Sequence, residues 1–295
     1  MTCAVFGFAA QAGASRRLAQ ALGISHETVN VRAFPDGESL VSVAPSPAIA
    51  LLYCSLNHPN EKLVEILLAA SALRDSGATK VVLIAPYLPY MRQDIAFHSG
   101  EAVSQRVVGK IIADGVDAVL TLDPHLHRTH SLSAILPGIE AVGVSAAPIL
   151  AAALANGDDP LLVGPDGEAR QWVERIARRE GLEFILGRKR RIGDREVELT
   201  IPDVERVHGR VAVLVDDLIS TGGTLKIAAR LLIEASASKV EALATHCLAG
   251  EADLKELQAA GIASIRATDS VESPVGTLPC AALLAMEVRR QGWCL

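Results

Sequence analysis

The chain has 295 residues, of which 50% are hydrophobic but only 3% aromatic, and it carries a formal net charge of −6. This length exceeds the usual size of one compact core, so we expect two domains. An apolar content dominated by Ala, Val, Leu and Ile suits parallel sheets covered by helices, and it argues against an all-β sandwich or a disordered chain. The negative charge gives no general attraction to nucleic acid, which would need a strong local basic patch.

The cysteines and the apolar runs indicate the cellular compartment of the protein. Its five cysteines are scattered and form no C-x-x-C pair: Cys3, Cys54, Cys247, Cys280 and Cys294. This pattern argues against a disulfide framework and a thiolate zinc site, so we expect buried thiols in a reducing cytoplasm. Residues 1–8 show no basic leader followed by a long apolar run, and apolar stretches elsewhere are strand-length. The sequence therefore predicts a soluble, cytoplasmic protein without a membrane partner.

Short β-branched runs alternate with helical stretches along the chain. We expect strands at residues 49–54, 80–85, 118–122, 161–163, 211–215 and 263–267. We expect helices at residues 61–74, 101–113, 147–155, 169–179, 224–235, 252–259 and 281–290. This alternation predicts two α/β domains in tandem, each a mainly parallel sheet covered by helices. We place the border at residue 143, giving domains 1–143 and 144–295; residues 156–160 are an alternative border, and the last helix has either domain as its packing partner.

Two segments of the first expected domain carry groups suited to a nucleotide. In residues 34–38, Phe34 offers a ring face for a base, and two carboxylates are available to accept from base or ribose donors. In residues 90–94, Arg92 is suited to a polyphosphate. Each segment alone is weak, because F-P-D-G is also a common turn.

Residues 122–125, Leu-Asp-Pro-His, end another buried strand and offer metal ligands. His127 and His130 follow closely, which makes an H-x-H-x-x-H zinc site the alternative to magnesium. Zinc prefers imidazole, whereas magnesium prefers oxygen ligands. For His127 and His130 a solvated surface position is the expected one.

Two further segments follow in the second expected domain. Residues 164–167, Gly-Pro-Asp-Gly, follow a strand and are equally suited to begin a helix with an aspartate cap. Residues 188–195 hold five basic side chains in eight positions and lead into the alternating run 196–200, which predicts a mobile hairpin. A run of this charge is usually a solvated face or a nucleic-acid patch.

The strongest signal is residues 213–224, Val-Leu-Val-Asp-Asp-Leu-Ile-Ser-Thr-Gly-Gly-Thr. A buried strand ends in two carboxylates and is followed by a glycine-containing turn that opens a helix, which is where open α/β sheets bind ligands. The hydroxyls and free N–H groups of the turn suit a phosphate, and the carboxylates suit sugar hydroxyls. The alternative makes the glycines a plain turn and the carboxylates a helix cap.

These segments together resemble the ribose-phosphate pyrophosphokinase family. Residues 213–224 resemble the phosphoribosyl diphosphate loop, which phosphoribosyltransferases share, while the remaining segments occur in the family's order and cover roughly residues 8–285. The resemblance implies two phosphoribosyltransferase-like domains and transfer of the diphosphoryl group of Mg-ATP to the C1 hydroxyl of ribose 5-phosphate. The expected cofactor is Mg²⁺, the partners are ATP and ribose 5-phosphate, and the assembly is a homo-oligomer, a dimer or larger.

The resemblance also implies roles for individual residues. ATP binding falls to Phe34, Asp36, Glu38, Arg92, Gln93 and Asp94. Metal binding falls to His125 and Asp166, with Asp123 as a further candidate, and transition-state stabilisation falls to Lys189 and Arg191. Ribose 5-phosphate binding falls to Asp216, Asp217, Ser220, Thr221, Gly222, Gly223 and Thr224.

The chain departs from the common bacterial members at two places. Ser220 stands where many have Asp, and residues 97–101 are closer to archaeal-type members. We therefore do not transfer the regulation by phosphate and ADP or the hexameric assembly of the common form. Three alternatives remain: a nucleobase phosphoribosyltransferase, a catalytically silent regulatory subunit of the family, and a metal-dependent hydrolase built around His125 and His127.

Overall fold

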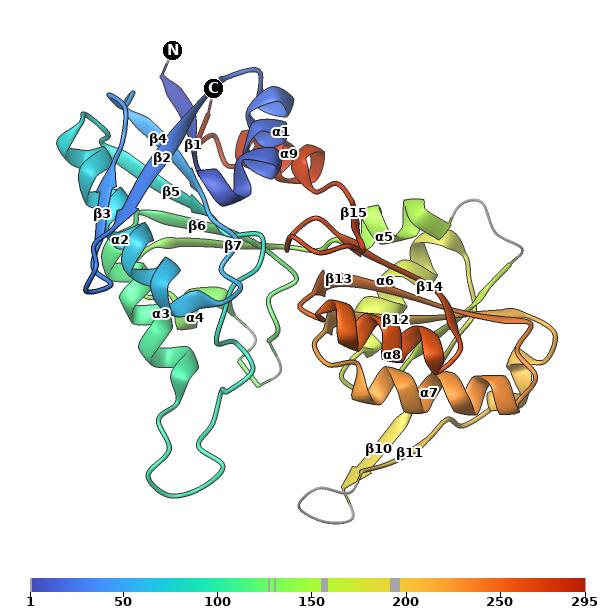
Figure 1. Cartoon of the computed structure of the whole chain (residues 1–295). Helices are drawn as coiled ribbons and strands as arrows, with labels where there is room; N and C mark the ends of the chain where they lie inside the picture. The colour runs from blue at the N-terminus through green and yellow to red at the C-terminus, as the bar shows by residue number, and fades with distance from the viewer. Residues whose placement is uncertain (1, 127, 130, 155–158, 192–196, 295) are drawn as a thin grey trace. The chain divides into compact units, whose positions relative to one another are not determined.

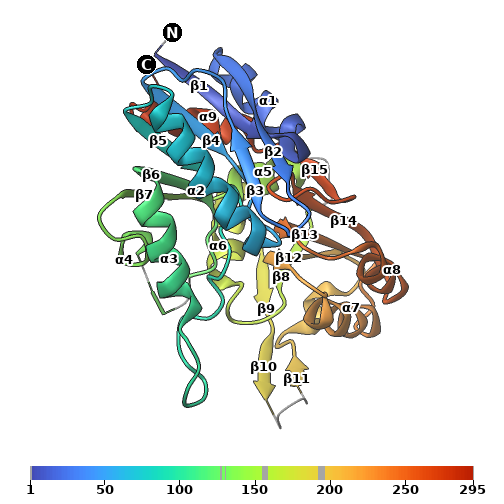
Figure 2. The same ribbon diagram turned by 60° about the vertical axis from the view of Figure 1, so that its left-hand side comes forward.

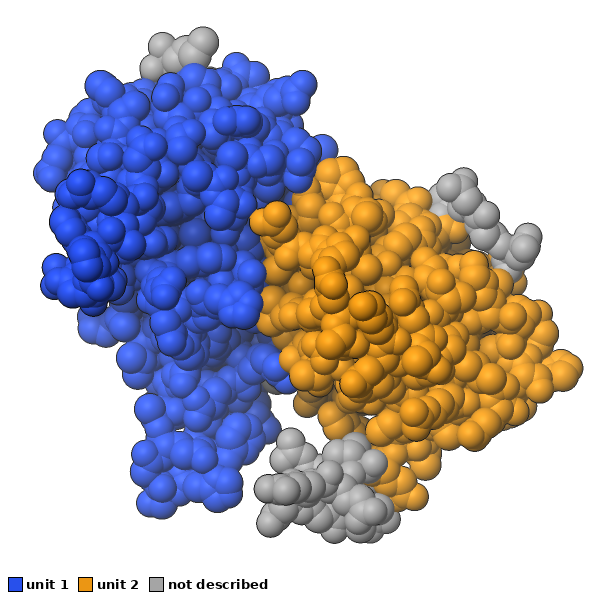
Figure 3. Space-filling model, in the orientation of Figure 1, with its two compact units in different colours: residues 1–144, 280–295 blue, residues 145–279 orange. Residues whose placement is uncertain are grey.

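The computed structural model describes residues 2–126, 128–129, 131–154, 159–191 and 197–294. The chain divides into two compact units, residues 1–144 with 280–295 and residues 145–279, which Figure 3 colours separately. The chain therefore returns to the first unit at its end. Helix α9 (Ala281–Arg290) belongs to unit 1, one of the two packing partners considered for it.

Unit 1 is built on a seven-stranded sheet in the order β3-β2-β1-β4-β5-β6-β7. Its strands are β1 (Cys3–Phe8), β2 (Ser25–Ala33), β3 (Ser39–Ser42), β4 (Ile49–Tyr53), β5 (Lys80–Ile84), β6 (Ala118–Leu122) and β7 (Glu140–Val144). β3 pairs antiparallel with β2, and the other pairs are parallel. The chain winds from β1 to β2 in one direction and from β4 to β7 in the other, so the winding reverses between β1 and β4.

Helices cover both faces of this sheet, which is why its central strands are continuous apolar runs. Figures 1 and 2 show α2 (Pro59–Asp75), α3 (Ser104–Gly115) and α4 (Leu132–Ile135) on one face, with α1 (Ala12–Leu22) and α9 on the other. A short 3-10 helix, η1 (Ala9–Gln11), precedes α1. Right-handed crossovers place α1 opposite the other helices because the winding reverses after β1.

The C-terminal segment is held to unit 1 by three side chains. Arg289 donates to the Ala21 carbonyl at 2.8 Å, and the buried Trp293 donates its indole N–H to Glu140 at 2.7 Å. Cys294 forms a disulfide with Cys3 at the start of β1. The expectation of free thiols is wrong for this pair, because only the return of α9 to unit 1 brings the two ends of the chain together. Cys54, Cys247 and Cys280 are buried thiols, as expected.

Unit 2 contains a six-stranded parallel sheet in the order β15-β14-β13-β12-β8-β9. Its strands are β8 (Leu161–Gly164), β9 (Phe184–Leu186), β12 (Val211–Ile219), β13 (Lys239–Cys247), β14 (Ile262–Thr268) and β15 (Gly276–Leu278). Helices α5 (Ala147–Leu154) and α6 (Arg170–Glu180) pack in one core cluster, and α7 (Gly223–Glu234) and α8 (Glu251–Ala259) in another. The winding reverses between β8 and β12.

A two-stranded hairpin of β10 (Arg188–Arg191) and β11 (Val197–Thr200) extends from unit 2, as Figure 1 shows. Its first stem is fixed at Gly187, whose N–H donates to the Gly164 carbonyl at 2.8 Å. A side chain at Gly187 would collide with the carbonyl oxygen of Pro165, so this close approach requires glycine. The second stem leads into a 3-10 helix, η2 (Val204–Val207). The predicted hairpin is confirmed.

The predicted fold class is also confirmed, with differences at particular elements. β12 continues to Ile219, so the two carboxylates lie inside the strand and not after it. α3 begins at Ser104 and not at residue 101, because the preceding residues form a loop. β13 is a strand that the sequence pattern does not predict, because polar Glu241, Thr245 and His246 interrupt it. Among the described residues, no helix is both long and apolar enough to cross a bilayer.

Candidate active site

The carboxyl ends of β8 and β12 form a natural ligand-binding point in unit 2. These strands are neighbours, and the chain winds away from them in opposite directions. Ligands of open α/β sheets bind beyond the strand ends at such a reversal. Asp166 follows β8, and residues 220–224 follow β12, so the fold gathers two segments that are far apart in sequence.

The turn into α7 has the geometry of an anion-binding loop. Gly222 precedes the helix with φ of 72°, and an added Cβ would lie 2.7–2.9 Å from carbons of Leu257. Both the left-handed backbone and the close approach require glycine. The N-cap residue, Gly222, has no side chain to cap α7, and the first N–H groups of a helix have no intrahelical acceptor, so they are suited to bind an anion. The alternative of a carboxylate cap is wrong, because Asp216 and Asp217 lie within β12.

Three carboxylates share the electrostatics of this site. Asp217 is 2% exposed, and Asp216 is half-buried, with its Oδ1 accepting the Asp217 N–H at 3.0 Å. Burial, followed by the charges of Asp217 and Asp166, raises the pKa of Asp216 well above its ordinary value. A bound cation or a set of sugar hydroxyls would relieve this repulsion.

Lys189 brings a positive charge from the hairpin to the same site. Its Nζ lies 3.9 Å from Asp166 Oδ2 and 3.4 Å from Thr224 Oγ1, so it joins β10, the turn after β8 and the start of α7. Asp166 also accepts the Glu168 N–H at 3.0 Å, which fixes the turn before α6. The side chain of Arg191 lies outside the described part of the chain.

The donor set of unit 2 suits magnesium. Mg²⁺ typically takes one or two carboxylates, with substrate phosphates and water completing its shell. Asp166 and Asp216 supply such oxygens, and the charge of Asp166 contributes to the raised pKa of Asp216 after burial and Asp217. Within the described residues, no group of three His, Cys, Asp or Glu side chains forms a ready-made metal site. His127 and His130, which define the zinc alternative, lie outside the described residues.

In unit 1, residues 34–38 form the exposed tip between β2 and β3. The Phe34 N–H donates to the Glu38 carbonyl at 2.7 Å, and Asp36 accepts the Glu38 N–H at 3.2 Å. The guanidinium of Arg32 lies 4.9 Å from the centroid of the Phe34 ring, which is itself 38% exposed. The tip is therefore a preformed turn with an exposed ring and two exposed carboxylates.

The other predicted nucleotide segment of unit 1 meets the predicted metal segment. Asp94 is buried and pairs with Arg128 at 2.7 Å, whereas Arg92 is exposed. Asp123 is buried with φ of 31°, and its N–H donates to the Val144 carbonyl at 2.9 Å. His125 follows it and is half-buried.

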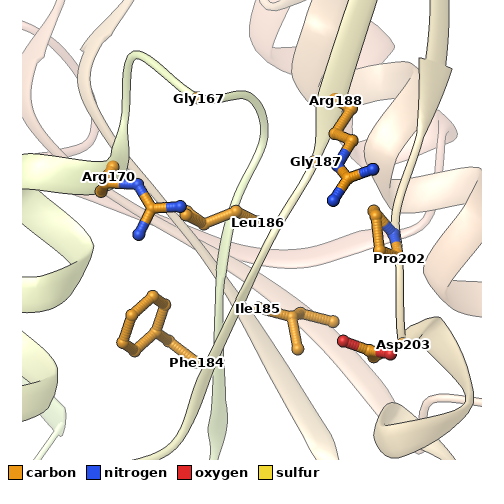
Figure 4. Close-up of a pocket in the computed structure, with 9 residues that line it drawn as sticks. All are labelled: Gly167, Arg170, Phe184, Ile185, Leu186, Gly187, Arg188, Pro202 and Asp203. Carbon is orange, nitrogen blue, oxygen red and sulfur yellow. The ribbon is translucent and has the colours of Figure 1, made fainter.

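A hollow of about 300 Å³ lies where the two stems of the hairpin part, and Figure 4 shows it. Arg170 of α6 and the side chains of β9 line it, together with Arg188 of β10 and residues 202–203 before η2. Its lining is Gly167, Arg170, Phe184, Ile185, Leu186, Gly187, Arg188, Pro202 and Asp203. The lining includes neither Asp216 nor the α7 turn, so this hollow is separate from the carboxylate site.

Comparison with known proteins agrees with this arrangement. Residues 3–114 match a model of the N-terminal domain of ribose phosphate pyrophosphokinase, and residues 131–276 match one of the phosphoribosyl transferase domain. A ribose-phosphate pyrophosphokinase of Methanopyrus kandleri is 37% identical over 278 residues, 92% of this chain and 94% of the relative. One of Archaeoglobus fulgidus is 34% identical over 274 residues, 93% and 96% of the two chains.

The fold has a match among solved structures. The phosphoribosylpyrophosphate synthetase of Mycobacterium smegmatis superposes with a TM-score of 0.83 over 99% of both chains, at 24% identity. The two units therefore define a protein of tandem phosphoribosyltransferase-like domains. The chain belongs to the ribose-phosphate pyrophosphokinase family, as the sequence resemblance predicts, and it is an enzyme that transfers diphosphate groups.

Proposed function

We propose that this chain transfers the diphosphoryl group of Mg-ATP to the C1 hydroxyl of ribose 5-phosphate. The C1 oxygen attacks the β-phosphorus, the bond from that phosphorus to the α,β-bridging oxygen breaks, and AMP leaves with the electron pair. The hydroxyl proton passes to solvent, so the products are 5-phosphoribosyl 1-diphosphate and AMP. The single observation that carries this proposal is the convergence of Lys189, Asp166 and Thr224 beside the open α7 turn.

The α7 turn holds the acceptor in this proposal. Ser220, Thr221 and the N–H groups from Gly223 onward bind the 5-phosphate, because they combine hydroxyl donors with the positive end of a helix. Asp216 and Asp217 accept hydrogen bonds from the ribose hydroxyls. Buried carboxylates favour these donors because each such bond stabilises their charge.

Lys189 stabilises the charge that moves during transfer. Phosphoryl-type transfers depend on positioning and charge neutralisation, with little need for covalent help from the protein. An ammonium on a hairpin, already within 4 Å of Asp166, is placed to meet a polyphosphate. We assign Arg191 to the same task because it lies two positions further along β10, at the second basic position of the K-x-R pair.

Magnesium and ATP complete the proposal. Bound Mg²⁺ would neutralise phosphate charge. Its proposed ligand in unit 2 is Asp166, and the proposed ligands of a separate magnesium in unit 1 are His125 and, further, Asp123. Phe34 stacks on the base, Asp36 and Glu38 accept from base or ribose, and Arg92 and Gln93 contact the nucleotide. Exposure of the Phe34 ring and of Arg92 supports these assignments.

We further propose that the chain forms a homo-oligomer, a dimer or larger, in the cytoplasm. Helices α2 and α3 expose large apolar side chains four residues apart, Val64 with Leu68 and Val107 with Ile111. Contiguous apolar surface of this kind is typical of an interface. Light scattering coupled to gel filtration measures the assembly directly.

Product analysis tests the reaction. We expect purified protein with ATP labelled in the β-phosphate, Mg²⁺ and ribose 5-phosphate to give labelled sugar diphosphate with an equal amount of AMP. Lys189→Ala should remove the labelled product, whereas Lys239→Ala, which changes a surface ion pair with Glu241, should not. Absence of labelled product from the unaltered protein would contradict the proposal and favour a silent regulatory subunit.

A further inference from the structure

In unit 1 a buried carboxylate joins two segments that are distant in sequence. Asp94 is 8% exposed, and both of its oxygens are occupied by one residue. Oδ1 accepts from Arg128 Nη1 at 2.7 Å, and Oδ2 accepts the backbone N–H of Arg128 at 3.3 Å. Burial alone would raise the pKa of Asp94, but these bonds outweigh it and lower the pKa, which keeps the carboxylate charged.

Gln105, in the first turn of α3, joins the same two segments. Its side chain is 2% exposed; the amide nitrogen donates to the Met91 carbonyl at 3.2 Å, and the amide oxygen accepts from the Thr129 hydroxyl at 3.2 Å. Its backbone N–H donates to the Gln93 carbonyl at 3.2 Å. The side chain of Gln105 therefore links the segment of Met91 to the segment of Thr129. These are the same two segments that Asp94 and Arg128 link.

We propose that Asp94 and Gln105 are positioning residues, which hold the segment of Arg92 against the segment of His125, and that Asp94 does not contact the nucleotide. This revises the role expected for Asp94 from sequence, and it rests on the proposed function. Asp94 has little surface open to a ligand, and each of its oxygens already accepts a hydrogen bond from Arg128. The segments flanking it carry the exposed and half-buried groups assigned to ATP and the metal.

A mutant cycle distinguishes positioning from direct contact. Asp94→Asn and Arg128→Gln should each lower kcat/KM for ATP by about tenfold, the usual cost of a lost charge-assisted hydrogen bond. If the two side chains act only through each other, the double variant should lose no more than the worse single variant. Multiplied losses would mean that Asp94 acts independently, as a nucleotide ligand does, and would overturn the proposal.

Kinetic constants separate positioning from general destabilisation. The loss should appear in KM for ATP, with KM for ribose 5-phosphate and the melting temperature nearly unchanged. Gln105→Met, which removes both amide hydrogen bonds, should share this signature. The control is Arg74→Gln, which removes a 3.1 Å ion pair with Asp117 elsewhere in unit 1 and should leave KM for ATP unchanged. Equal changes in both KM values would contradict the proposal.

Hydrogen exchange tests the proposal without relying on activity. In the ligand-free protein, Asp94→Asn should speed exchange both in peptides containing Met91 and in peptides containing Thr129, because the contact holds both segments. Faster exchange in only one of them would overturn the proposal. If the unaltered protein made no sugar diphosphate while both peptides responded, the proposed function would fail and the structural link would stand.

Discussion

Each unit has a loop at the point where the winding of its sheet reverses, and the two loops differ in whether their polar groups already have partners within the unit. In unit 2 the winding reverses between β8 and β12, and the glycine N-cap leaves the helix N–H groups beyond β12 without a side-chain cap. In unit 1 it reverses between β1 and β4, and side chains of the unit itself occupy that loop. The fold therefore places a loop at the winding reversal in both units, and the residues of the loop decide whether a ligand can bind there.

The contacts of Ser55 show how the position in unit 1 is occupied. Gln11 donates to the Ser55 carbonyl at 2.9 Å and accepts its N–H at 2.6 Å. Lys62 donates to the same carbonyl at 2.9 Å and to Asn57 at 2.7 Å. The backbone groups that would face a ligand are already satisfied. We therefore expect the loop after β4 to contribute stability, and the loop after β12 to contribute binding.

The largest expected effect on activity comes from replacing Lys189 in unit 2, and the matched variant replaces Lys62 in unit 1. Lys189→Ala should lower kcat by about 10²–10³-fold, because it removes charge stabilisation at the transferring group, and should leave the melting temperature unchanged. Lys62→Ala should lower the melting temperature and change kcat by less than about threefold, because it removes a structural donor. Steady-state kinetics and thermal melts measure both. A large kcat loss in Lys62→Ala would break the comparison.

A pair of neighbouring glycines sharpens the account of unit 2. Gly222→Ala should destabilise the protein by about 2–4 kcal/mol, because it strains a left-handed backbone and pushes a methyl group into Leu257. Gly223→Ala should leave the melting temperature unchanged, since its Cβ would meet nothing within 4 Å. Equal destabilisation by both would show that the turn is not held by the close approach to Leu257.

The Cys3–Cys294 disulfide lies within unit 1, so we expect it to stabilise unit 1 and not unit 2. Cys294→Ser should lower the melting transition of unit 1 by several degrees, because a bond between the chain ends constrains the unfolded chain by typically 2–4 kcal/mol. Reductant should have the same effect on the unaltered protein and none on the variant. Calorimetry with and without reductant gives both values. A melting temperature insensitive to reductant would show that the bond does not form in solution.

Much of unit 2 could be predicted because its signals are local. The loop of residues 220–224 and the hairpin of Lys189 are written in short stretches of sequence, and their chemistry follows from composition and order. The contact of Lys189 with Asp166 was not predicted, because nothing local links β10 to the turn after β8. The position of the carboxylates inside β12 was missed, since buried aspartates do not resemble strand residues.

Unit 1 was predicted less completely because its decisive contacts are non-local. Gln11 meets Ser55, and Asp94 meets Arg128, across 44 and 34 residues of sequence. Neither pairing leaves a local pattern, and Gln105 was read as an ordinary helix residue. The Cys3–Cys294 bond likewise depends on α9 returning to unit 1, which helical periodicity cannot decide. Such contacts follow from topology and not from propensity.

The smallest effect tests whether the carboxylates of unit 2 sacrifice stability for binding. Asp216→Asn should raise the melting temperature of the ligand-free protein by about 2–4 °C, roughly 1 kcal/mol, because it removes a buried charge that Asp217 and Asp166 repel. The folded pKa of Asp216 is raised, so the unaltered protein loses stability as the pH rises from the ordinary value of 3.8 through that pKa. The stability gained by the variant should therefore shrink as the pH falls from 8 toward 5.

Added Mg²⁺ should stabilise the unaltered protein more than the Asp216→Asn variant, since a bound cation relieves the same repulsion. A variant that is less stable than the unaltered protein at pH 8 would mean that groups within unit 2 stabilise the charge of Asp216. The loops after β4 and β12 would then be the remaining difference between the two units.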